Sequence, residues 1–356
     1  MIKKTKPIHS IVRQKLQGYF LRLLKIIIPL KSSQEVIKED LQKILVVRIN
    51  YRIGNVLFIT PIIEQLEQEF PNAKIDVLIG AGFTKTLFTG FSNVEDIFDF
   101  PRKKLKNPIE LFKYIKHLRS KKYDAVFNVN YGSSSDKFAT LLARSRYKIG
   151  FCQEELFTPV THCVQKQDNV KHASLKPLEL MKAVGKKPNY ALRMSIALSA
   201  TELSNAKKSL EKLVDGYSYK KVIAIFRNAR WEKKLEDSWW YKLVENIENR
   251  DTDILIIDIL SPDVKEPLRP DILHYEEKDL RKLAAFIANL DAFVCADTGP
   301  MHLASASGVP TIALFNTTDV DSYGPIGTYD KVINLLNLTE TDIANMVVDY
   351  VSHCKG

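Results

Sequence analysis

The chain has 356 residues, of which 45% are hydrophobic and 26% are charged. This is the composition of a soluble globular protein, and the length suggests two domains. No apolar run approaches the roughly 20 residues that a membrane-spanning helix needs. The sequence suggests neither a zinc site nor a disulfide framework, and a reducing cytosol fits best, because the four cysteines are scattered without a C-x-x-C pair.

The formal net charge of +10 is unevenly distributed along the chain. Residues 1–43 hold ten Lys/Arg and three acidic residues, and residues 102–148 hold thirteen and three. Basic regions of this kind can bind nucleic acid, but the sequence shows no zinc-finger spacing, RNP sequence or helix-turn-helix. We therefore expect no nucleic-acid partner, and an anionic acceptor or an anionic membrane surface explains the same charge.

Residues 8–30 predict an amphipathic helix, since apolar residues recur every three or four positions with Lys15, Arg22 and Lys25 between them. No small-residue cleavage site follows, so the segment does not resemble a signal peptide. A basic amphipathic helix can lie on an anionic membrane surface. Packing of this helix on the protein's own core is an equally open alternative.

Strands and helices alternate from Lys43 onwards, which predicts a parallel, doubly wound sheet. The predicted strands are 43–49, 74–79 and 125–129, and the predicted helices are 56–70, 107–119, 137–143 and 171–185. Thr60 and Pro61 are expected to kink or restart the first helix. The loop 50–55 follows the first strand, where such domains bind ligands, and Gly54 would let the backbone fold tightly over one.

A second alternating series follows a polar break that begins at Lys186. The predicted helices are 201–213, 239–247, 279–289 and 340–351, and the predicted strands are 222–226, 253–259, 292–296 and 311–315. We therefore predict an N-terminal extension at 1–43, a first domain at 44–195 and a second domain at 196–356.

Residues 291–319 predict a strand, a turn, a short helix and a second strand. Pro300 suits the first position of the helix, and Gly308 is expected to end it. The small-residue turn of this βαβ unit lies at the carboxyl end of its first strand. In open α/β sheets this edge is where ligands bind.

The turn at Asp297, Thr298 and Gly299 predicts a phosphate or pyrophosphate site. A helix N-terminus offers free backbone N–H groups and the positive end of the helix dipole. Thr298 adds a hydroxyl donor, Gly299 permits close approach, and His302 lies in the first helical turn. Alternatively, Asp297 or Thr298 is only an N-cap.

Three ordered stretches together resemble glycosyltransferase family 9, the bacterial heptosyltransferase family. They are residues 44–80, residues 121–151 and the stretch DTGPMHLASASGVPTIALFNTTD at 297–319. The resemblance runs, with gaps, from about residue 44 to residue 325. It implies an α/β protein of GT-B architecture, in which two Rossmann-like doubly wound domains face each other across a cleft. The first domain would bind the acceptor and the second would bind a nucleotide-sugar.

The resemblance also implies an activity. This is the inverting transfer of a heptose or similar sugar from a nucleotide-diphosphate donor, of the ADP-heptose type, to a lipopolysaccharide core or related glycan. The implied enzyme acts on an anionic glycolipid at the cytoplasmic face of the bacterial inner membrane. It uses no cofactor and no metal, because a helix dipole and basic side chains stabilise the leaving diphosphate.

Several site residues follow from the resemblance. In the family, the loop after the first strand of the second domain carries a lysine that faces the donor phosphates, and alignment places Lys233 there, with Lys234 as its neighbour. Asp263 lies in the loop that holds the nucleoside, where a carboxylate could accept hydrogen bonds from a ribose diol. Arg52 and Gly54 belong to the acceptor-side loop.

One position departs from the family pattern. The residue after Gly54 is usually an aspartate that acts as the general base, but here it is Asn55, whose carboxamide cannot accept a proton at physiological pH. Asn55 could position the acceptor while another group acts as base, or the reaction could proceed with little base help. Alternatively, the chain could be an inactive binding protein, or Asn55 could be only a helix N-cap.

Another alternative is a dehydrogenase, since both halves are Rossmann-like. The first strand–helix turn argues against it, because residues 48–55 supply only one glycine of the G-x-G-x-x-G fingerprint.

Overall fold

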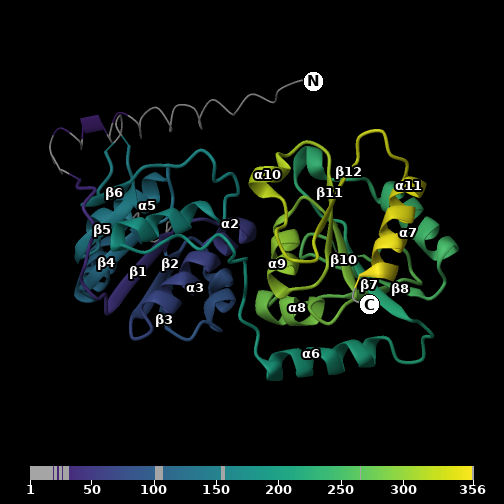
Figure 1. The fold of residues 1–356 in the computed structure, drawn as a ribbon. Coiled ribbons are helices and arrows are strands. Elements are labelled where there is room, and N and C mark those ends of the chain that lie inside the picture. The colour runs from purple at the N-terminus through teal and green to yellow at the C-terminus, as the bar shows by residue number, and fades with distance from the viewer. Residues whose placement is uncertain are drawn as a thin grey trace.

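The computed structural model describes residues 19, 22, 23, 26, 32–100, 107–153, 157–264 and 266–354. Figure 1 shows two α/β domains side by side, each built on one sheet. Most of the extension predicted at 1–43, including most of the helix predicted at 8–30, lies outside the described residues. The four described residues between 19 and 26 are helical. Among the residues that the structure describes, no helix is long and apolar enough to cross a membrane.

The first sheet has six parallel strands in the order β3-β2-β1-β4-β5-β6. Its strands are β1 (Lys43–Arg48), β2 (Lys74–Ile79), β3 (Val94–Asp99), β4 (Tyr123–Asn128), β5 (Ser145–Phe151) and β6 (His162–Val164). Its helices are α2 (Ile53–Leu57), α3 (Thr60–Glu69), α4 (Pro108–Ser120) and α5 (Ser134–Leu142), with 3₁₀ turns η1 (Gly82–Phe88) and η3 (Lys176–Val184). The predicted restart of the first helix is confirmed, since α2 ends at Leu57 and α3 begins at Thr60 with Pro61 in its first turn.

Three helix predictions in this half were wrong at their starts. The first helix begins with α2 at Ile53, three residues earlier than predicted, so part of the predicted loop 50–55 is helical. The helix α5 begins three residues earlier than predicted, because the Ser133 hydroxyl accepts a hydrogen bond from the backbone N–H of Asp136 and caps it. The helix predicted at 171–185 is a 3₁₀ segment that starts only at Lys176. The residues before it form a turn in which the His172 ring contacts the Ser174 hydroxyl at 2.8 Å.

The second sheet is also parallel, in the order β12-β11-β10-β7-β8-β9. Its strands are β7 (Lys221–Phe226), β8 (Ile254–Ile259), β9 (Leu273–Tyr275), β10 (Ala292–Ala296), β11 (Thr311–Phe315) and β12 (Lys331–Asn334). Its helices are α6 (Ala200–Leu213), α7 (Asp237–Arg250), α8 (Leu280–Ile287), α9 (Gly299–Ser307), α10 (Val320–Tyr323) and α11 (Glu340–His353), with the 3₁₀ turn η4 (Trp231–Lys233). The predicted βαβ unit is confirmed as β10, α9 and β11, and Gly308 ends α9 with a left-handed φ of 85°.

Helices that follow the carboxyl ends of central strands in the two sheets meet between the domains. In each sheet, successive strands are added first towards one side and then towards the other. This reversal of strand order lies between β1 and β4 in the first sheet and between β10 and β7 in the second. Ligands bind outside the carboxyl ends of the strands at such a point. The helix α2 follows β1, the helix α9 follows β10, and these two helices contact each other between the domains.

The expectation that no disulfide is present was wrong. Cys152 and Cys163 form a disulfide bond, with their Cα atoms 4.8 Å apart. The physical reason is the register of neighbouring parallel strands. Cys163 lies opposite Gly150, and the backbone N–H of Cys152 donates to the Val164 carbonyl, so the two cysteines meet at the end of β5. A pairing set by strand register leaves no signature in the spacing of the cysteines.

Candidate active site

The N-terminus of α9 is held in place by a fully buried strand. Every residue of β10 is buried, and the chain leaves it through the nearly buried Asp297. Thr298 occupies the N-cap position in an extended conformation, but its side chain makes no capping hydrogen bond. The alternative that Thr298 serves as an ordinary side-chain cap is therefore not supported.

Lys233 and Asp297 form an ion pair across the carboxyl edge of the second sheet. The ammonium nitrogen of Lys233, at the end of η4, lies 2.5 Å from Oδ2 of Asp297. Lys233 is half-buried, whereas its neighbour Lys234 is exposed. The structure therefore places Lys233, and not Lys234, beside the first turn of α9. A cation in this position adds to the positive end of the helix dipole.

Two hydrogen bonds join the loops around Lys233. The amide of Asn228 donates to the Ser261 hydroxyl at 2.8 Å and links the loops after β7 and β8. The amide of Asn316 donates to the Glu232 carbonyl at 2.7 Å and links the loop after β11 to η4. By contrast, Asp263 lies exposed on the loop after β8 and is not drawn into this network.

His302 is a buried, neutral group in the first turns of α9. It is only 6% exposed, and burial lowers the pKa of its imidazole to about 3, with the positive charge of Lys233 acting in the same direction. Its ring packs edge-on against Phe58, with 4.8 Å between ring centroids. At physiological pH this side chain is thus an uncharged packing surface with one buried ring nitrogen, Nδ1, that has no hydrogen-bond partner among the described residues.

The acceptor-side loop of the first domain lies directly against this helix. A Cβ atom added to Gly54 would come within 2.3 Å of Cδ2 of His302, and one added to Gly299 would lie 3.3 Å from Cβ of Ile53. The guanidinium of Arg52 lies 5.7 Å from the ring centroid of Trp231. The structure therefore brings the predicted acceptor-side residues Arg52 and Gly54 of the first domain close to the predicted donor-side residues of the second domain.

Asn55 lies inside α2 and does not cap it. The N-cap of this helix is Arg52, so the alternative that Asn55 is only an N-cap was wrong. The Asn55 amide nitrogen donates to Oδ1 of Asn50 at 3.3 Å, and the same oxygen accepts from the backbone N–H of Arg52 at 2.9 Å. Because a backbone N–H can only donate, the orientation of Asn50 is fixed and Asn55 must present its NH₂ group to it.

Sequence reasoning missed a buried carboxylate behind this loop. Oδ1 of Asp136 accepts hydrogen bonds from the backbone N–H of Ile49 at 3.0 Å and from the Ser133 hydroxyl at 2.9 Å, while Oδ2 is buried without a partner among the described residues. Burial raises the pKa of Asp136 to about 6, and the charge of Arg48 partly opposes that rise. Arg48 in turn donates from Nε to the Asn55 carbonyl at 3.1 Å. The Ser-x-x-Asp spacing at 133–136 was the available signal, since it is close to that of a capping box.

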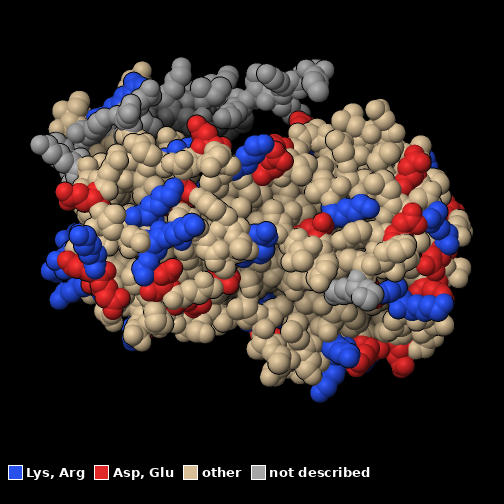
Figure 2. All heavy atoms as spheres, in the orientation of Figure 1, with Lys and Arg blue, Asp and Glu red and all other residues tan. Residues whose placement is uncertain are grey.

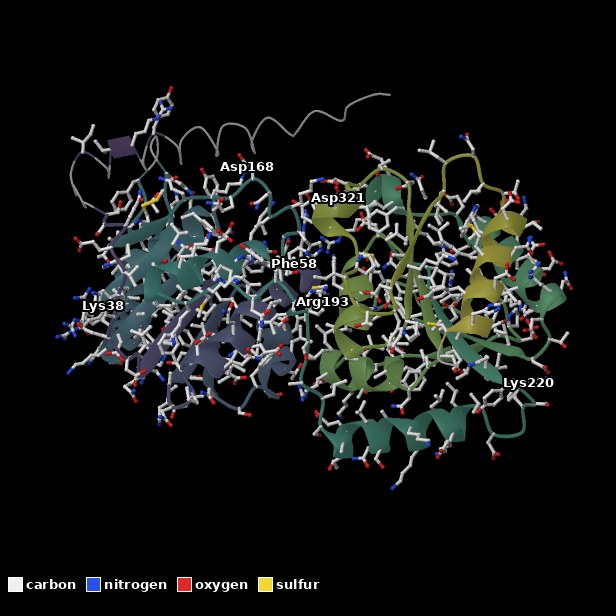
Figure 3. The ribbon with its side chains drawn as sticks, viewed as in Figure 1. Lys38, Phe58, Asp168, Arg193, Lys220 and Asp321 are labelled. Carbon is white, nitrogen blue, oxygen red and sulfur yellow. A yellow bond between two sulfur atoms is a disulfide. The ribbon has the colours of Figure 1, made fainter. Side chains whose placement is uncertain are left out.

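An aromatic cluster at the junction of the domains was also missed. Phe58 contacts the rings of His302, His172 and Tyr323. Figure 3 shows Phe58 at this junction, between the two sheets. The His172 ring also lies 2.9 Å from the Gly324 carbonyl through Nε2. No sequence pattern marks such a cluster, because its four members come from four separate segments.

Comparison with known proteins gives the family of the chain. The family model for glycosyltransferase family 9 (heptosyltransferase) matches residues 111–346. Lipopolysaccharide heptosyltransferase 3 of Escherichia coli is 24% identical over 283 residues, which cover 75% of this chain and 81% of that protein.

Two solved structures have a similar fold. The glycosyl transferase family 9 protein from Veillonella parvula DSM 2008 has a TM-score of 0.74 at 16% identity, covering 89% of this chain and 99% of its own. The E. coli ADP-heptose LPS heptosyltransferase II has a TM-score of 0.69 at 17% identity, covering 87% and 99%. The predicted GT-B architecture is confirmed.

Proposed function

Because this chain belongs to glycosyltransferase family 9, we propose that it transfers a heptose or a similar sugar, with inversion, from a nucleotide-diphosphate donor to a lipopolysaccharide core or related glycan. One observation carries the proposal. The N-terminus of α9, with Lys233 beside it, lies against the start of α2 in the other domain, at Arg52–Asn55. A donor diphosphate and an acceptor hydroxyl bound to these two elements would be neighbours.

The donor proposal rests on charge and on the relatives. The first N–H groups of α9, the Thr298 hydroxyl and the Lys233 ammonium suit a diphosphate. A solved structure with this fold is an ADP-heptose heptosyltransferase, which supports an ADP-heptose-like donor.

In the proposed reaction the acceptor oxygen attacks the anomeric carbon while the bond from that carbon to the diphosphate breaks. Negative charge then grows on the leaving diphosphate. The N-terminus of α9 and Lys233 stabilise this charge. Since these groups supply the charge stabilisation that a metal ion could otherwise provide, we propose no cofactor beyond the donor.

A thermal-shift screen with ADP-, UDP-, GDP- and dTDP-sugars tests the donor. Ligand that binds only the native state raises the melting temperature, by an amount that corresponds to about 2.7 kcal/mol at a hundredfold excess over Kd. We expect the ADP-sugar to give the largest shift. An equal response to all four sugars would contradict an adenine-specific donor site.

A second candidate function is that of a binding protein without transfer activity. The two candidates differ in whether the site has a group that accepts the proton of the acceptor hydroxyl. Asn55 motivates that candidate, since an amide cannot serve as the base. We expect slow transfer by the wild type and faster transfer by Asn55→Asp, because general-base help is typically about 10²–10⁴-fold. Single-turnover rates of the wild type, Asn55→Asp and Asn55→Ala with a purified core acceptor give the answer.

The outcomes separate clearly. A fast wild type that is slowed by Asn55→Asp would show that another group is the base. Transfer by neither protein, with donor binding intact, would support the binding protein.

We also propose that the enzyme works on the cytoplasmic face of the inner membrane, where its anionic glycolipid acceptor would be held. The basic extension at 1–43, with ten Lys/Arg and three acidic residues, supports this proposal by its charge. Its described residues Tyr19, Leu23 and Ile26 are helical and exposed. These positions recur on one helix face, as in an interfacial amphipathic helix.

A further inference from the structure

The helix α4 has two faces of opposite character. Its inner stripe of Leu111, Tyr114, Ile115 and Leu118 recurs at helical spacing, and Tyr114 and Leu118 join the core on one side of the first sheet. The opposite stripe would ordinarily be polar. Here it begins with two large apolar residues, Ile109 and Phe112, and continues with basic residues, Lys113 and Lys116.

The apolar residues of the outer stripe are among the most exposed of the protein. Ile109 is 63% exposed and Phe112 is 68% exposed, although both belong to a regular helix. They lie three positions apart and therefore share one face. Adjacent exposed apolar side chains on one helix face are more informative than single ones, which are normal on protein surfaces.

The position of this pair in the fold is not random. Among the described residues of the first domain (44–195), Tyr190 follows η3, and the other five large apolar side chains that are exposed follow the carboxyl ends of strands of the first sheet. They are Tyr51 after β1, Phe83 after β2, Ile109 and Phe112 after β3, and Tyr131 after β4. Carboxyl ends of parallel strands meet at one edge of the sheet. The start of α2, at Arg52–Asn55, follows β1 at the same edge, so the apolar pair and the acceptor-side segment follow strands of one sheet edge.

The charge around the pair is positive. The helix α4 contains Lys113, Lys116 and Arg119 but only one acidic residue, Glu110, which pairs with Lys113 at 2.9 Å. The sequence from 102 to 148 holds thirteen Lys/Arg and three acidic residues. Figure 2 shows Lys and Arg side chains over the part of the first domain where Figure 1 labels α5, the helix that packs beside α4.

We propose that the outer face of α4 docks on an anionic lipid bilayer, with Ile109 and Phe112 entering the boundary between headgroups and acyl chains. Lys113 and Lys116 would then face the lipid phosphates. This docking would turn the acceptor-side edge of the first sheet towards a membrane-held acceptor. That last consequence rests on the proposed function, but the docking itself does not.

Charge favours a bilayer over a second copy of the chain. A two-fold interface places the same patch on both partners. Pairing α4 with its own copy would bring Lys113 and Lys116 close to the same lysines of the partner, which like-charge repulsion disfavours. An anionic surface complements both the apolar pair and the cations behind it.

The test uses the full chain, because the extension at 1–43 is expected to bind the same vesicles. Four proteins are compared, namely the wild type, Ile109→Ser/Phe112→Ser, Leu23→Ser/Ile26→Ser and the quadruple variant. An exposure-matched control, Tyr217→Ser/Leu336→Ser, alters the second domain, where these residues are 50% and 67% exposed. Partitioning onto vesicles of phosphatidylcholine with 30% phosphatidylglycerol is measured without donor or acceptor.

We expect Ile109→Ser/Phe112→Ser to weaken partitioning by about tenfold, most clearly when Leu23 and Ile26 are also changed, because each apolar side chain removed from water contributes several-fold. The control should partition like the wild type, and pure phosphatidylcholine should bind more weakly. The proposal is overturned if Ile109→Ser/Phe112→Ser partitions as strongly as the control. It is also overturned if the wild type self-associates without lipid and this variant does not, since the outer face of α4 would then bind a second copy of the chain.

A second readout keeps docking separate from catalysis. Transfer to a lipid-free acceptor should be unchanged in Ile109→Ser/Phe112→Ser, whereas transfer to an acceptor embedded in vesicles should fall with the partitioning. An equal fall with both acceptors would show that the variant damages the fold or the site, and would contradict a docking role. If the wild type transfers sugar to neither acceptor, the proposed function is wrong. The vesicle measurement still tests membrane docking in that case, because it needs neither donor nor acceptor.

Discussion

Replacing Gly54 with alanine tests whether the two halves of the site depend on their direct contact. The added Cβ would lie 2.3 Å from Cδ2 of His302, whereas ordinary van der Waals contact begins near 3.4 Å. One of the two groups must therefore move by about 1 Å. The His302 ring has little room, because it is 6% exposed and packs on the buried Phe58 ring.

The expected cost follows from this geometry. An extra methyl group in a well-packed region typically destabilises the fold by about 1–3 kcal/mol. Alanine inside a helix offsets up to about 1 kcal/mol of this loss, because it has a higher helix propensity than glycine. Because the clash lies between domains, it can be relieved when α2 moves away from α9 as well as by unfolding. We expect a small fall in melting temperature and a fall in the single-turnover rate of about tenfold, equivalent to 1.4 kcal/mol.

Gly132→Ala is the matched control, since nothing lies within 4 Å of a Cβ added there. Donor affinity should be nearly unchanged in Gly54→Ala, because the groups proposed to bind the donor belong to the second domain. His302→Ala should partly rescue Gly54→Ala by making room for the methyl group. The reasoning is refuted if Gly54→Ala transfers sugar as fast as Gly132→Ala, or if the double variant shows no coupling between the two positions.

Three further predictions concern binding and stability. Thr298→Ala and Lys233→Ala should each weaken donor binding by about 1–3 kcal/mol in calorimetry, the usual scale for hydrogen bonds to charged groups, and unchanged affinity in both would contradict the donor site. Burial raises the pKa of Asp136 from 3.8 to about 6, so this group's contribution to stability is present below pH 3.8 and is lost as the pH rises towards 6. The free energy of unfolding of Asp136→Asn relative to wild type should therefore rise by about 2 kcal/mol between pH 4 and pH 7 in urea titrations, and a constant difference would argue against the shift. The free energy of unfolding of Cys152→Ser/Cys163→Ser should be about 3 kcal/mol lower than that of wild type, as expected for a disulfide that closes a loop of this length. Dithiothreitol should lower the stability of the wild type but not that of the variant.

The sequence predicted the second domain's site region closely because its signals are local. The two strands of residues 292–315 have the predicted bounds, and α9 ends before Gly308 as predicted, but it begins at Gly299, one residue before Pro300. The first strand of each domain was also found, because buried parallel strands are continuous apolar runs.

The missed elements have weaker local patterns. The strands β3 and β5 are only half-buried over most of their length, so they lack a continuous apolar run. The Cys152–Cys163 bond depends on strand register, and the cluster around Phe58 depends on how two domains meet. Such contacts are set by tertiary structure, and a single sequence does not encode them at any fixed spacing.

The surroundings of Asn55 suit an amide better than a carboxylate. Oδ1 of Asn50 is held towards position 55 by the backbone N–H of Arg52, and it accepts a hydrogen bond from the Asn55 amide. An ionised aspartate at 55 has no proton to donate and would place two acceptors about 3.3 Å apart. Asn55→Asp must therefore rotate away from Asn50, or lose a hydrogen bond whose net contribution is about 1 kcal/mol. That loss is small beside the several kcal/mol that a general base can contribute to the rate, so the loop geometry does not by itself forbid a restored base. Asn50 and Asn55 are better treated as a pair, and Asn50→Ser/Asn55→Asp is the variant in which a new carboxylate would find a donor.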